Sequence, residues 1–196
     1  HPGDSVVTGP SGSSRSSSVI DGWLAANREK LVAWRRQIHA HPELSRQEVA
    51  TTDLVMAELT ALGLSPRRLP LGTGAVCDLG PESDTRIALR ADMDALPITE
   101  HTGLPFSSTI DAVSHACGHD AHTAILLATG ALLAGVDDLP VGVRLIFQAA
   151  EEVMPGGALD AIDAGVLAGV SRIFALHCDP RLPVGSVGLR AGALTS

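Results

Sequence analysis

The sequence predicts an α/β protein whose sheet carries helices on its faces. Short apolar runs bounded by turn residues alternate with helical segments over residues 74–177, and this order is typical of α/β folds. Hydrophobic residues make up 45% of the 196 residues and charged residues 18%, so a packed core is expected. Several apolar runs end in His, Asp or Glu, at the positions where open α/β sheets bind ligands.

The first segment, residues 1–18, is rich in Ser, Gly and Pro and is expected to be a disordered tail. Residues 19–40 have apolar residues at helical spacing and predict an amphipathic helix. These apolar residues are Leu24, Leu31, Trp34 and Ile38. Pro42 is expected to end the helix, because proline disfavours the helical conformation in the residue before it.

A second helix is predicted to start near Ser45. Ser45 and Glu48 have the Ser-x-x-Glu spacing of a capping box, in which both side chains accept hydrogen bonds from backbone N–H groups at the helix start. The apolar residues of this helix are Val55, Leu59 and Leu62. Gly63 is expected to stop it.

The remaining elements are predicted from apolar runs between turn residues. The predicted strands are 74–80, 86–92, 141–150 and 171–177, and the predicted helices are 122–135 and 156–167. Polar residues close or follow three of these strands. Because ligands bind outside the carboxyl ends of strands in open α/β sheets, we expect these polar residues to share one site.

The stretch HACGHDAH, residues 115–122, concentrates His, Cys and Asp in a chain with only 8 His and 3 Cys. Cys117 and His119 could present a thiolate and an imidazole to one metal ion. Two other interpretations stay open: a small buried cysteine beside a helix-capping histidine, or a Cys/His nucleophile pair. The nucleophile pair is the less usual arrangement, since such partners normally come from distant segments of the chain.

Glu151 and Glu152 close the strongly apolar strand 141–150, where a buried carboxylate needs a partner. A solvated loop is the simple interpretation. The functional one is that one Glu binds metal while its neighbour takes a proton from water. His177 closes strand 171–177 and is either a structural histidine or a third strand-end ligand.

Asp92 and Asp94 lie on the same side of an extended segment, because strand side chains alternate between the two faces. They are candidates to bind metal or to hold a ligand histidine in one tautomer, and a surface turn is the alternative. A thiolate, imidazoles and carboxylates together suit zinc, while manganese, cobalt or nickel are further candidates. The number of candidate ligands predicts two divalent ions about 3.5–4 Å apart.

Composition argues against two classes of partner. The net charge of -8 is unfavourable for nucleic acid, which is bound through clustered Lys and Arg. A membrane partner is not expected either, since the sequence has no apolar run of about 18 residues. Three scattered cysteines suit a reducing compartment, so a cytoplasmic protein is expected.

Five motifs occur in order: RRQIHAHPELSRQE, ALRADMDALPI, HACGHDAHTA, FQAAEEVMPGGA and ALHCDPRLPVGSVGLRAG. Together they resemble the amidohydrolase branch of the aminoacylase and carboxypeptidase dinuclear metallopeptidase family. That branch includes hippurate hydrolases, auxin-conjugate hydrolases and N-acetyldiaminopimelate deacetylases. The resemblance implies a three-layer α/β/α sandwich with a mostly parallel mixed sheet. It also implies that a metal-activated water hydrolyses the amide bond of N-acyl amino acids, peptides or related small conjugates.

The resemblance also implies roles for individual residues. The metal ligands would be Cys117, His119, Glu152 and His177, with Cys117 bridging two ions. Glu151 matches the general base that activates water. Asp92 matches an acidic residue beside the metals that orients a ligand. His122 lies in the matching segment and has no expected role beyond supporting a ligand. Cys178 directly follows His177 and either faces the core or offers a second thiol near the metals.

Family members are about twice as long as this chain. The resemblance therefore implies that residues 19–196 are the N-terminal part of a metallohydrolase catalytic domain. A lid and dimerisation domain and one late metal-binding histidine would be absent, and the complete protein would be a homodimer. The alternative function is a non-catalytic metal-binding fragment, inactive as a truncated chain. A cysteine-dependent hydrolase is a third alternative.

Overall fold

The structure, a computed structural model, describes residues 5–7 and 14–189. The helices are α1 (Ser14–Ala40), α2 (Val49–Ala61), α3 (His119–Ala134) and α4 (Gly157–Asp163). The strands are β1 (Ser5–Val7), β2 (Arg67–Arg68), β3 (Ala75–Leu79), β4 (Arg86–Asp92), β5 (Gly142–Gln148), β6 (Val170–Ala175) and β7 (Val187–Leu189). Within these described ranges, no helix combines the length and apolar character needed to cross a membrane.

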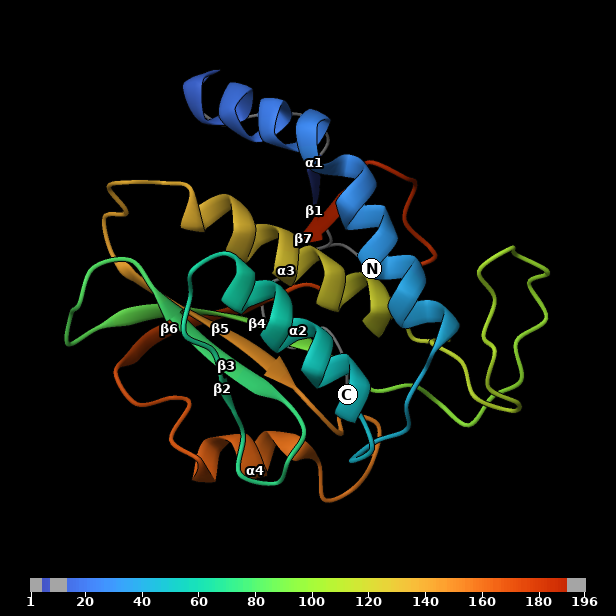
Figure 1. Cartoon of the computed structure of the whole chain (residues 1–196). Helices are drawn as coiled ribbons and strands as arrows, with labels where there is room; N and C mark the ends of the chain where they lie inside the picture. The colour runs from blue at the N-terminus through green and yellow to red at the C-terminus, as the bar shows by residue number, and fades with distance from the viewer. Residues whose placement is uncertain (1–4, 8–13, 190–196) are drawn as a thin grey trace.

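The main sheet has the strand order β2-β3-β5-β4-β6. β4 pairs in parallel with both of its neighbours, whereas β3 is antiparallel to β2 and to β5. Helices α1, α2 and α3 lie over one face of this sheet and α4 lies over the other (Figure 1). The predicted α/β fold is therefore confirmed, as an open mixed sheet between two layers of helices.

Alternating strand residues fill the two halves of the core. On β5, Leu145 and Phe147 pack into the cluster beneath α1, α2 and α3, whereas Ile146 packs into the cluster that contains Ala161 of α4. This alternation follows from the period of two in a strand. Burying each large apolar side chain contributes about 1.5–3 kcal/mol, so the two clusters hold the strand ends in place.

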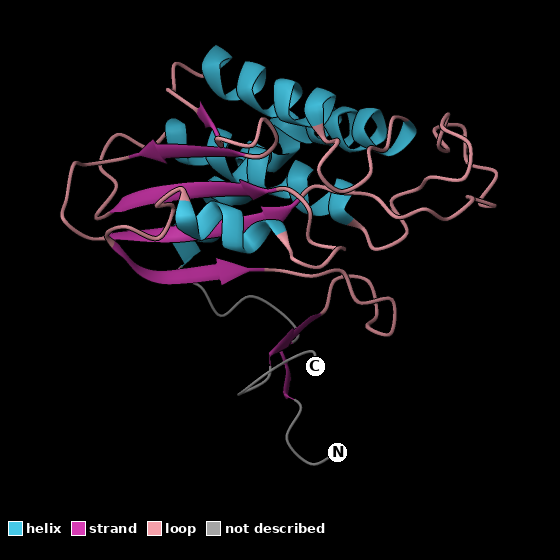
Figure 2. Ribbon diagram, turned by 90° about the horizontal axis from the view of Figure 1, so that it is seen from below, coloured by secondary structure: helices cyan, strands magenta, loops and turns pink. Residues whose placement is uncertain are grey.

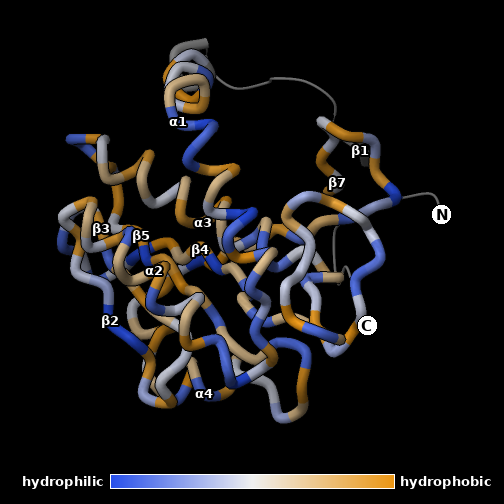
Figure 3. Tube along the Cα trace, turned by 45° about the vertical axis from the view of Figure 1, so that its right-hand side comes forward, coloured by the Kyte–Doolittle hydropathy of each residue, from blue (hydrophilic) through white to orange (hydrophobic). Residues whose placement is uncertain are grey.

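Helix α1 ends at Ala40, as expected, but begins at Ser14 rather than at residue 19. No Pro or Gly lies between residues 14 and 19 to stop the helix. Trp34 and Ile38 are buried, whereas Leu24 is 41% exposed and is not the core residue its spacing predicts. Hydrophilic and hydrophobic stretches alternate along α1 (Figure 3), as expected for an amphipathic helix.

The expected tail, residues 1–18, is described only in part. Residues 5–7 form β1, which pairs antiparallel with β7 in a small ribbon separate from the main sheet (Figure 2). Residues 14–18 belong to α1, and residues 1–4 and 8–13 lie outside the described residues. The domain boundary at residue 19 stays a prediction.

The predicted capping box of α2 is wrong. Helix α2 begins at Val49, and no side-chain cap comes from its N-cap residue, Glu48. The N–H groups of Ala50 and Thr51 instead donate to the carboxylate of Glu43, at 3.0 and 2.8 Å. Because Glu43 supplies the cap, the carboxyl of Glu48 is free to point elsewhere.

The four main strands fall within or beside their predicted ranges. β5 ends at Gln148, so the two glutamates follow the strand after a two-residue turn. β6 ends at Ala175, so His177 lies two residues beyond its strand. The sequence did not indicate β2, which has two residues, or the ribbon of β1 and β7. Such short strands carry too few residues for an alternating pattern to be recognised.

Candidate metal centre

The candidate ligands meet where the carboxyl ends of β4, β5 and β6 face the first turn of α3. Three groups of donor atoms lie close enough to hold an ion, with every atom of a group within 4.8 Å of the others. The groups are Cys117 with His119 and His177, Asp92 with His119 and His122, and His119 with Glu151 and Glu152. The parallel pairing of β4 with β5 and β6 brings these strand ends together.

His119, the first residue of α3, is common to all three groups and is completely buried. Its Nδ1 lies 3.3 Å from Oδ1 of Asp94, an arrangement in which the ring donates and Nε2 keeps its lone pair. Among the described residues Nε2 has no hydrogen-bond partner, and it lies 3.6 Å from Glu152 Oε1 and 4.0 Å from Glu151 Oε2. A carboxylate that fixes a histidine tautomer in this way is typical of metal sites.

The electrostatics around His119 favour a cation. Burial lowers the pKa of His119, but the hydrogen bond to Asp94 and the nearby charge of Asp92 outweigh burial, and the pKa is raised. A buried carboxylate oxygen of Glu152, Oε1, also lacks a hydrogen-bond partner in the part of the chain that the structure describes. The His119 Nε2 and the Glu152 Oε1 thus face each other among negatively charged carboxylates. A nitrogen and an oxygen ligand atom in this arrangement fit a divalent metal ion.

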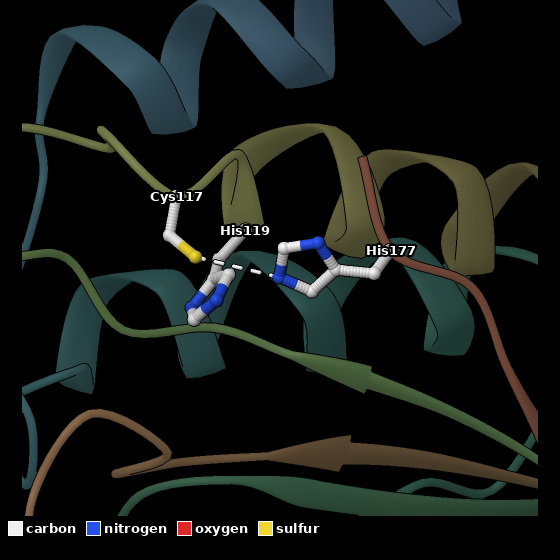
Figure 4. Close-up of side chains that lie close together, drawn as sticks. All are labelled: Cys117, His119 and His177. Carbon is white, nitrogen blue, oxygen red and sulfur yellow. Dashed lines mark hydrogen bonds between the residues drawn. The ribbon is translucent and has the colours of Figure 1, made fainter. Parts of the chain in front are cut away.

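Cys117 and His177 form the neighbouring part of the site. The Cys117 Sγ lies 3.4 Å from the His177 Nε2, and the His177 Nδ1 lies 2.8 Å from the backbone oxygen of Cys178. Figure 4 shows the Cys117 thiol and the His177 ring directed toward each other beside His119. Because Nδ1–H donates to a carbonyl, Nε2 of His177 is left as the acceptor atom that a metal would use.

Burial is the main reason why the pKa of Cys117 is raised to about 12, and the negative charge of Glu152 adds to this effect. Without a cation the thiol therefore keeps its proton at neutral pH. A cysteine nucleophile needs a lowered pKa, so this environment argues against a Cys/His nucleophile. A metal ligand, in contrast, loses its proton when the ion binds.

Glu151 and Glu152 follow a sharp turn after β5. Ala150, which precedes them, has a φ of 54, a left-handed conformation that is uncommon outside glycine. The Glu152 N–H donates to Oδ2 of Asp94 at 2.9 Å. The Glu151 carboxyl is 42% exposed, and burial together with the charge of Glu152 raises its pKa. Glu151 is thus the more exposed carboxyl of the pair and Glu152 the more buried one.

Asp94, and not Asp92, is the carboxylate that accepts a hydrogen bond from His119, and the role that the resemblance implies for Asp92 stays a prediction. The Asp92 Oδ1 accepts a hydrogen bond from His122 Nδ1 at 2.6 Å, and its Oδ2 accepts one from Arg90 at 2.6 Å. Oδ1 also lies 3.6 Å from Nε2 of His119, on the side where an ion would bind. Asp92 therefore lies in the site but is engaged with His122.

His122 lies between Asp92 and the segment after β6. Its Nε2 accepts the Cys178 N–H at 2.8 Å, so Nδ1 carries the proton that is donated to Asp92. Sequence reasoning assigned no definite role to His122 or Cys178, although His122 follows His119 by one helical turn and so had to share its face. Asp94 was a candidate through its alternation with Asp92, but it was not among the residues to which the resemblance gave a role.

Gly118 allows this arrangement at the start of α3. It has a φ of 88, and a Cβ there would lie 3.2 Å from the Cys178 Cβ. A side chain at this position would strain the backbone and press on the segment that carries His177. The glycine inside the HACGHDAH stretch is thus required by both backbone conformation and close packing.

Comparisons with known proteins identify what this chain is similar to. A family model described as peptidase family M20/M25/M40 matches residues 88–193. N-acetylcysteine deacetylase of Bacillus subtilis (strain 168) is 47% identical over 168 residues, which are 84% of this chain and 44% of that protein. A Rhodococcus jostii (strain RHA1) protein with the provisional name glutamate--cysteine ligase 2-3 is 57% identical over 170 residues, 87% of this chain but 21% of the longer protein.

A solved structure shares the fold. The crystal structure of the Bacillus subtilis YXEP protein, a dinuclear metal binding peptidase from the M20 family, superposes with a TM-score of 0.78 at 47% sequence identity. The match covers 82% of this chain and 45% of that one. The chain thus spans less than half the length of these two Bacillus subtilis relatives.

Proposed function

The chain belongs to peptidase family M20/M25/M40, and we propose that it carries the metal centre of an amidohydrolase that cleaves the amide bond of N-acyl amino acids. One observation carries the proposal: in the described part of the chain His119 Nε2 is buried without a hydrogen-bond partner and faces the carboxylates of Glu151 and Glu152, beside the Cys117 and His177 pair. An unpartnered ring nitrogen in such a group is typical of a ligand position.

In this proposal Cys117, His119, Glu152 and His177 hold two divalent ions, zinc or manganese, or else cobalt or nickel. The relative with a dinuclear metal site supports the number of ions. When bound, such ions polarise an amide carbonyl and lower the pKa of water. Asp94 keeps His119 in the tautomer that a ligand needs, and the Cys178 carbonyl does the same for His177.

Glu151 moves the proton. Its Oε2 accepts a proton from the attacking water and then delivers it to the leaving amine, as one group acting first as base and then as acid. Burial and the charge of Glu152 raise the pKa of Glu151, which makes its carboxylate a better proton acceptor. Because its side chain is 42% exposed, a substrate can reach it.

N-acetylcysteine is the first substrate to test, because it is the substrate named for a relative that is 47% identical. We further propose a cytoplasmic protein, since a thiolate ligand requires reduced cysteines and Cys77, Cys117 and Cys178 are free. Small molecules are the proposed substrates, without nucleic acid or membrane partners. Dimerisation through a lid domain, as the resemblance implies, completes the proposal.

The test is metal removal and return. The chain is treated with a chelator, dialysed, and assayed on N-acetylcysteine before and after zinc or manganese is added. Loss of turnover on chelation and recovery with metal support the proposal. Turnover that survives complete metal removal contradicts it and favours a cysteine-dependent hydrolase. Tight metal binding without turnover under any condition favours the alternative, a non-catalytic metal-binding role.

A further inference from the structure

Within the stretch SRQE, residues 45–48, Glu48 contacts the turn that carries the two glutamates, and Ser45 contacts Asp94. Their sequence resembles a helix cap, but Glu43 caps α2 instead. Ser45 and Glu48 point away from the helix start and toward residues 94 and 150. Two side chains that the helix does not use therefore have another structural purpose.

Glu48 is fully buried, and its carboxyl oxygen Oε1 accepts the backbone N–H of Ala150 at 2.7 Å. Its other oxygen, Oε2, is buried and has no hydrogen-bond partner within residues 5–7 and 14–189. Burying a carboxyl group that is only half satisfied is unfavourable, so its presence points to a requirement at Ala150. That requirement is an acceptor for a buried N–H which no strand partner satisfies.

Ala150 is the residue that turns the chain toward the site. Its φ of 54 places a non-glycine residue in the left-handed region, directly before Glu151. The turn is held on both sides, because the Ala150 oxygen accepts the Gly157 N–H at 2.7 Å. Gly157 must be glycine here, since a Cβ would lie 2.1 Å from the Ala149 oxygen.

A second hydrogen bond holds the other end of the glutamate pair. The Oδ2 of Asp94 accepts both the Glu152 N–H at 2.9 Å and the Ser45 hydroxyl at 2.6 Å. The backbone N–H groups before and after Glu151 are thus each bound by a carboxyl group. Ser45 fixes one of these carboxyl groups, and Glu48 supplies the other.

We propose that Glu48 is a positioning residue, which holds the Ala150 turn and thereby sets where the carboxyl groups of Glu151 and Glu152 lie relative to His119. The expected effect of Glu48 on catalytic turnover rests on the proposed function, whereas its effect on the backbone turn at Ala150 does not. Because reacting groups displaced by about 1 Å lose on the order of 100-fold in rate, a loosened turn would be felt in catalysis.

Glutamine is the informative replacement. Burial raises the pKa of Glu48, although the hydrogen bond from the Ala150 N–H acts in the opposite direction. Gln keeps the same shape and a carbonyl oxygen that can accept the Ala150 N–H. Glu48→Gln is therefore expected to behave like the wild-type chain, whereas Glu48→Ala removes the acceptor altogether.

The matched control is Glu43→Ala. Glu43 also accepts two backbone N–H groups, but they belong to the start of α2 and not to the glutamate turn. The three variants and the wild-type chain are compared by amide hydrogen exchange of the peptide that spans residues 148–153. The same samples are titrated with cobalt(II), followed by its absorption spectrum, and assayed on N-acetylcysteine.

We expect faster exchange at residues 150 and 152 in Glu48→Ala alone, with cobalt affinity or kcat reduced about 10–100-fold and KM changed less. Glu48→Gln should show the amide exchange of the wild-type chain and its cobalt affinity or kcat. Unchanged exchange in Glu48→Ala, or equal acceleration in Glu43→Ala, would overturn the proposal. If exchange changes as expected but the wild-type chain shows neither cobalt binding nor turnover, the positioning role stands and the proposed function fails.

Discussion

The two ring nitrogens of His119 have different surroundings. On one side Asp94 binds Nδ1, and on the other side Nε2 is open toward Glu151 and Glu152. The ring is completely buried, so it has no solvent to compensate an unused nitrogen. With Nδ1 held by Asp94, His119 is pre-organised to bind one ion through Nε2. Glu151 and Glu152, which face this nitrogen, can then be assigned different roles.

Glu151→Gln is expected to lower kcat on N-acetylcysteine by about 10²–10⁴-fold, because the amide cannot accept a proton from water. Bound metal should stay near the wild-type level, since the proposed ligand is Glu152. Turnover and elemental analysis of the same sample check both statements.

Glu152→Gln provides the contrast to this variant, because it is expected to lose metal as well as activity. Near wild-type turnover of Glu151→Gln would mean that another residue is the base.

Gly118 directly precedes α3 and His119 is the first residue of the helix, so the backbone of this pair sets the direction of the His119 side chain. Gly118 has a positive φ, the Cys178 N–H donates to His122 in the first turn of the helix, and the helix then runs beneath α1. The helix start and the segment after β6 are therefore in direct contact. A change at this glycine acts on both elements at once.

Gly118→Ala is expected to destabilise the fold by about 1–2 kcal/mol through its left-handed backbone and to weaken metal binding as well. The second effect follows from the contact of 3.2 Å that a Cβ would make with Cys178. Urea unfolding without metal and cobalt(II) titration of the folded chain separate the two effects.

Gly63→Ala is the matched control, because Gly63 has a φ of 78 but open space around it. It should lose similar stability and keep its metal affinity. If both variants bind metal equally well, the contact with Cys178 has no influence on the site.

The Arg144 side chain ties β5 to β3 and to the segment after α4. It donates to both oxygens of Asp78, at 2.6 and 2.7 Å, and to the carbonyls of Val166 and Ala168. Asp78→Asn should cost about 1 kcal/mol at pH 7, a discounted value because the Asp78 side chain is 38% exposed. Urea unfolding at neutral pH measures this loss.

The same pair predicts a pH dependence. Hydrogen bonds from Arg144 lower the pKa of Asp78 below its ordinary value of 3.8. The stabilisation is therefore present above that value and is lost as the pH falls through the lower folded-state pKa. The stability difference between the wild-type chain and Asp78→Asn should shrink as the pH falls below about 4. A difference that grows on acidification would contradict this assignment.

The elements that could be predicted from the sequence are those in which the pattern of apolar residues follows directly from burial. The run GVRLIFQ is buried throughout in β5, so its strand and the position of Glu151 follow from apolar content alone. The pair Ser45 and Glu48 could not be interpreted in this way. A Ser-x-x-Glu pattern has the same letters whether the side chains cap a helix or bind a turn about a hundred residues later. That choice depends on tertiary contacts, which outweigh local preference.

At the scale of the whole molecule, β6 is an open edge of the described sheet. It pairs with β4 only, and Ile173 and Phe174 are 51% and 53% exposed. An exposed edge with apolar side chains favours pairing with another chain. The same strand leads to His177, so association at this edge would lie close to the site.

The 196-residue chain is expected to self-associate through β6, and Ile173→Lys should increase the monomer fraction in sedimentation velocity. Val49→Lys is the control, because Val49 is also 51% exposed but lies on α2. Association that both substitutions reduce equally would point to general hydrophobicity rather than to the strand edge.

The Glu48–Ala150 hydrogen bond joins residues 102 positions apart, and the Cys117–His177 contact joins residues 60 apart. Closing such long loops is costly in entropy before any contact is gained, so the site should assemble late in folding. Metal ions are therefore expected to stabilise the folded chain once the site has formed, and not to affect the early steps of folding. In stopped-flow experiments, added metal should slow unfolding and leave the refolding rate nearly unchanged, because contacts absent from the transition state act on the unfolding step.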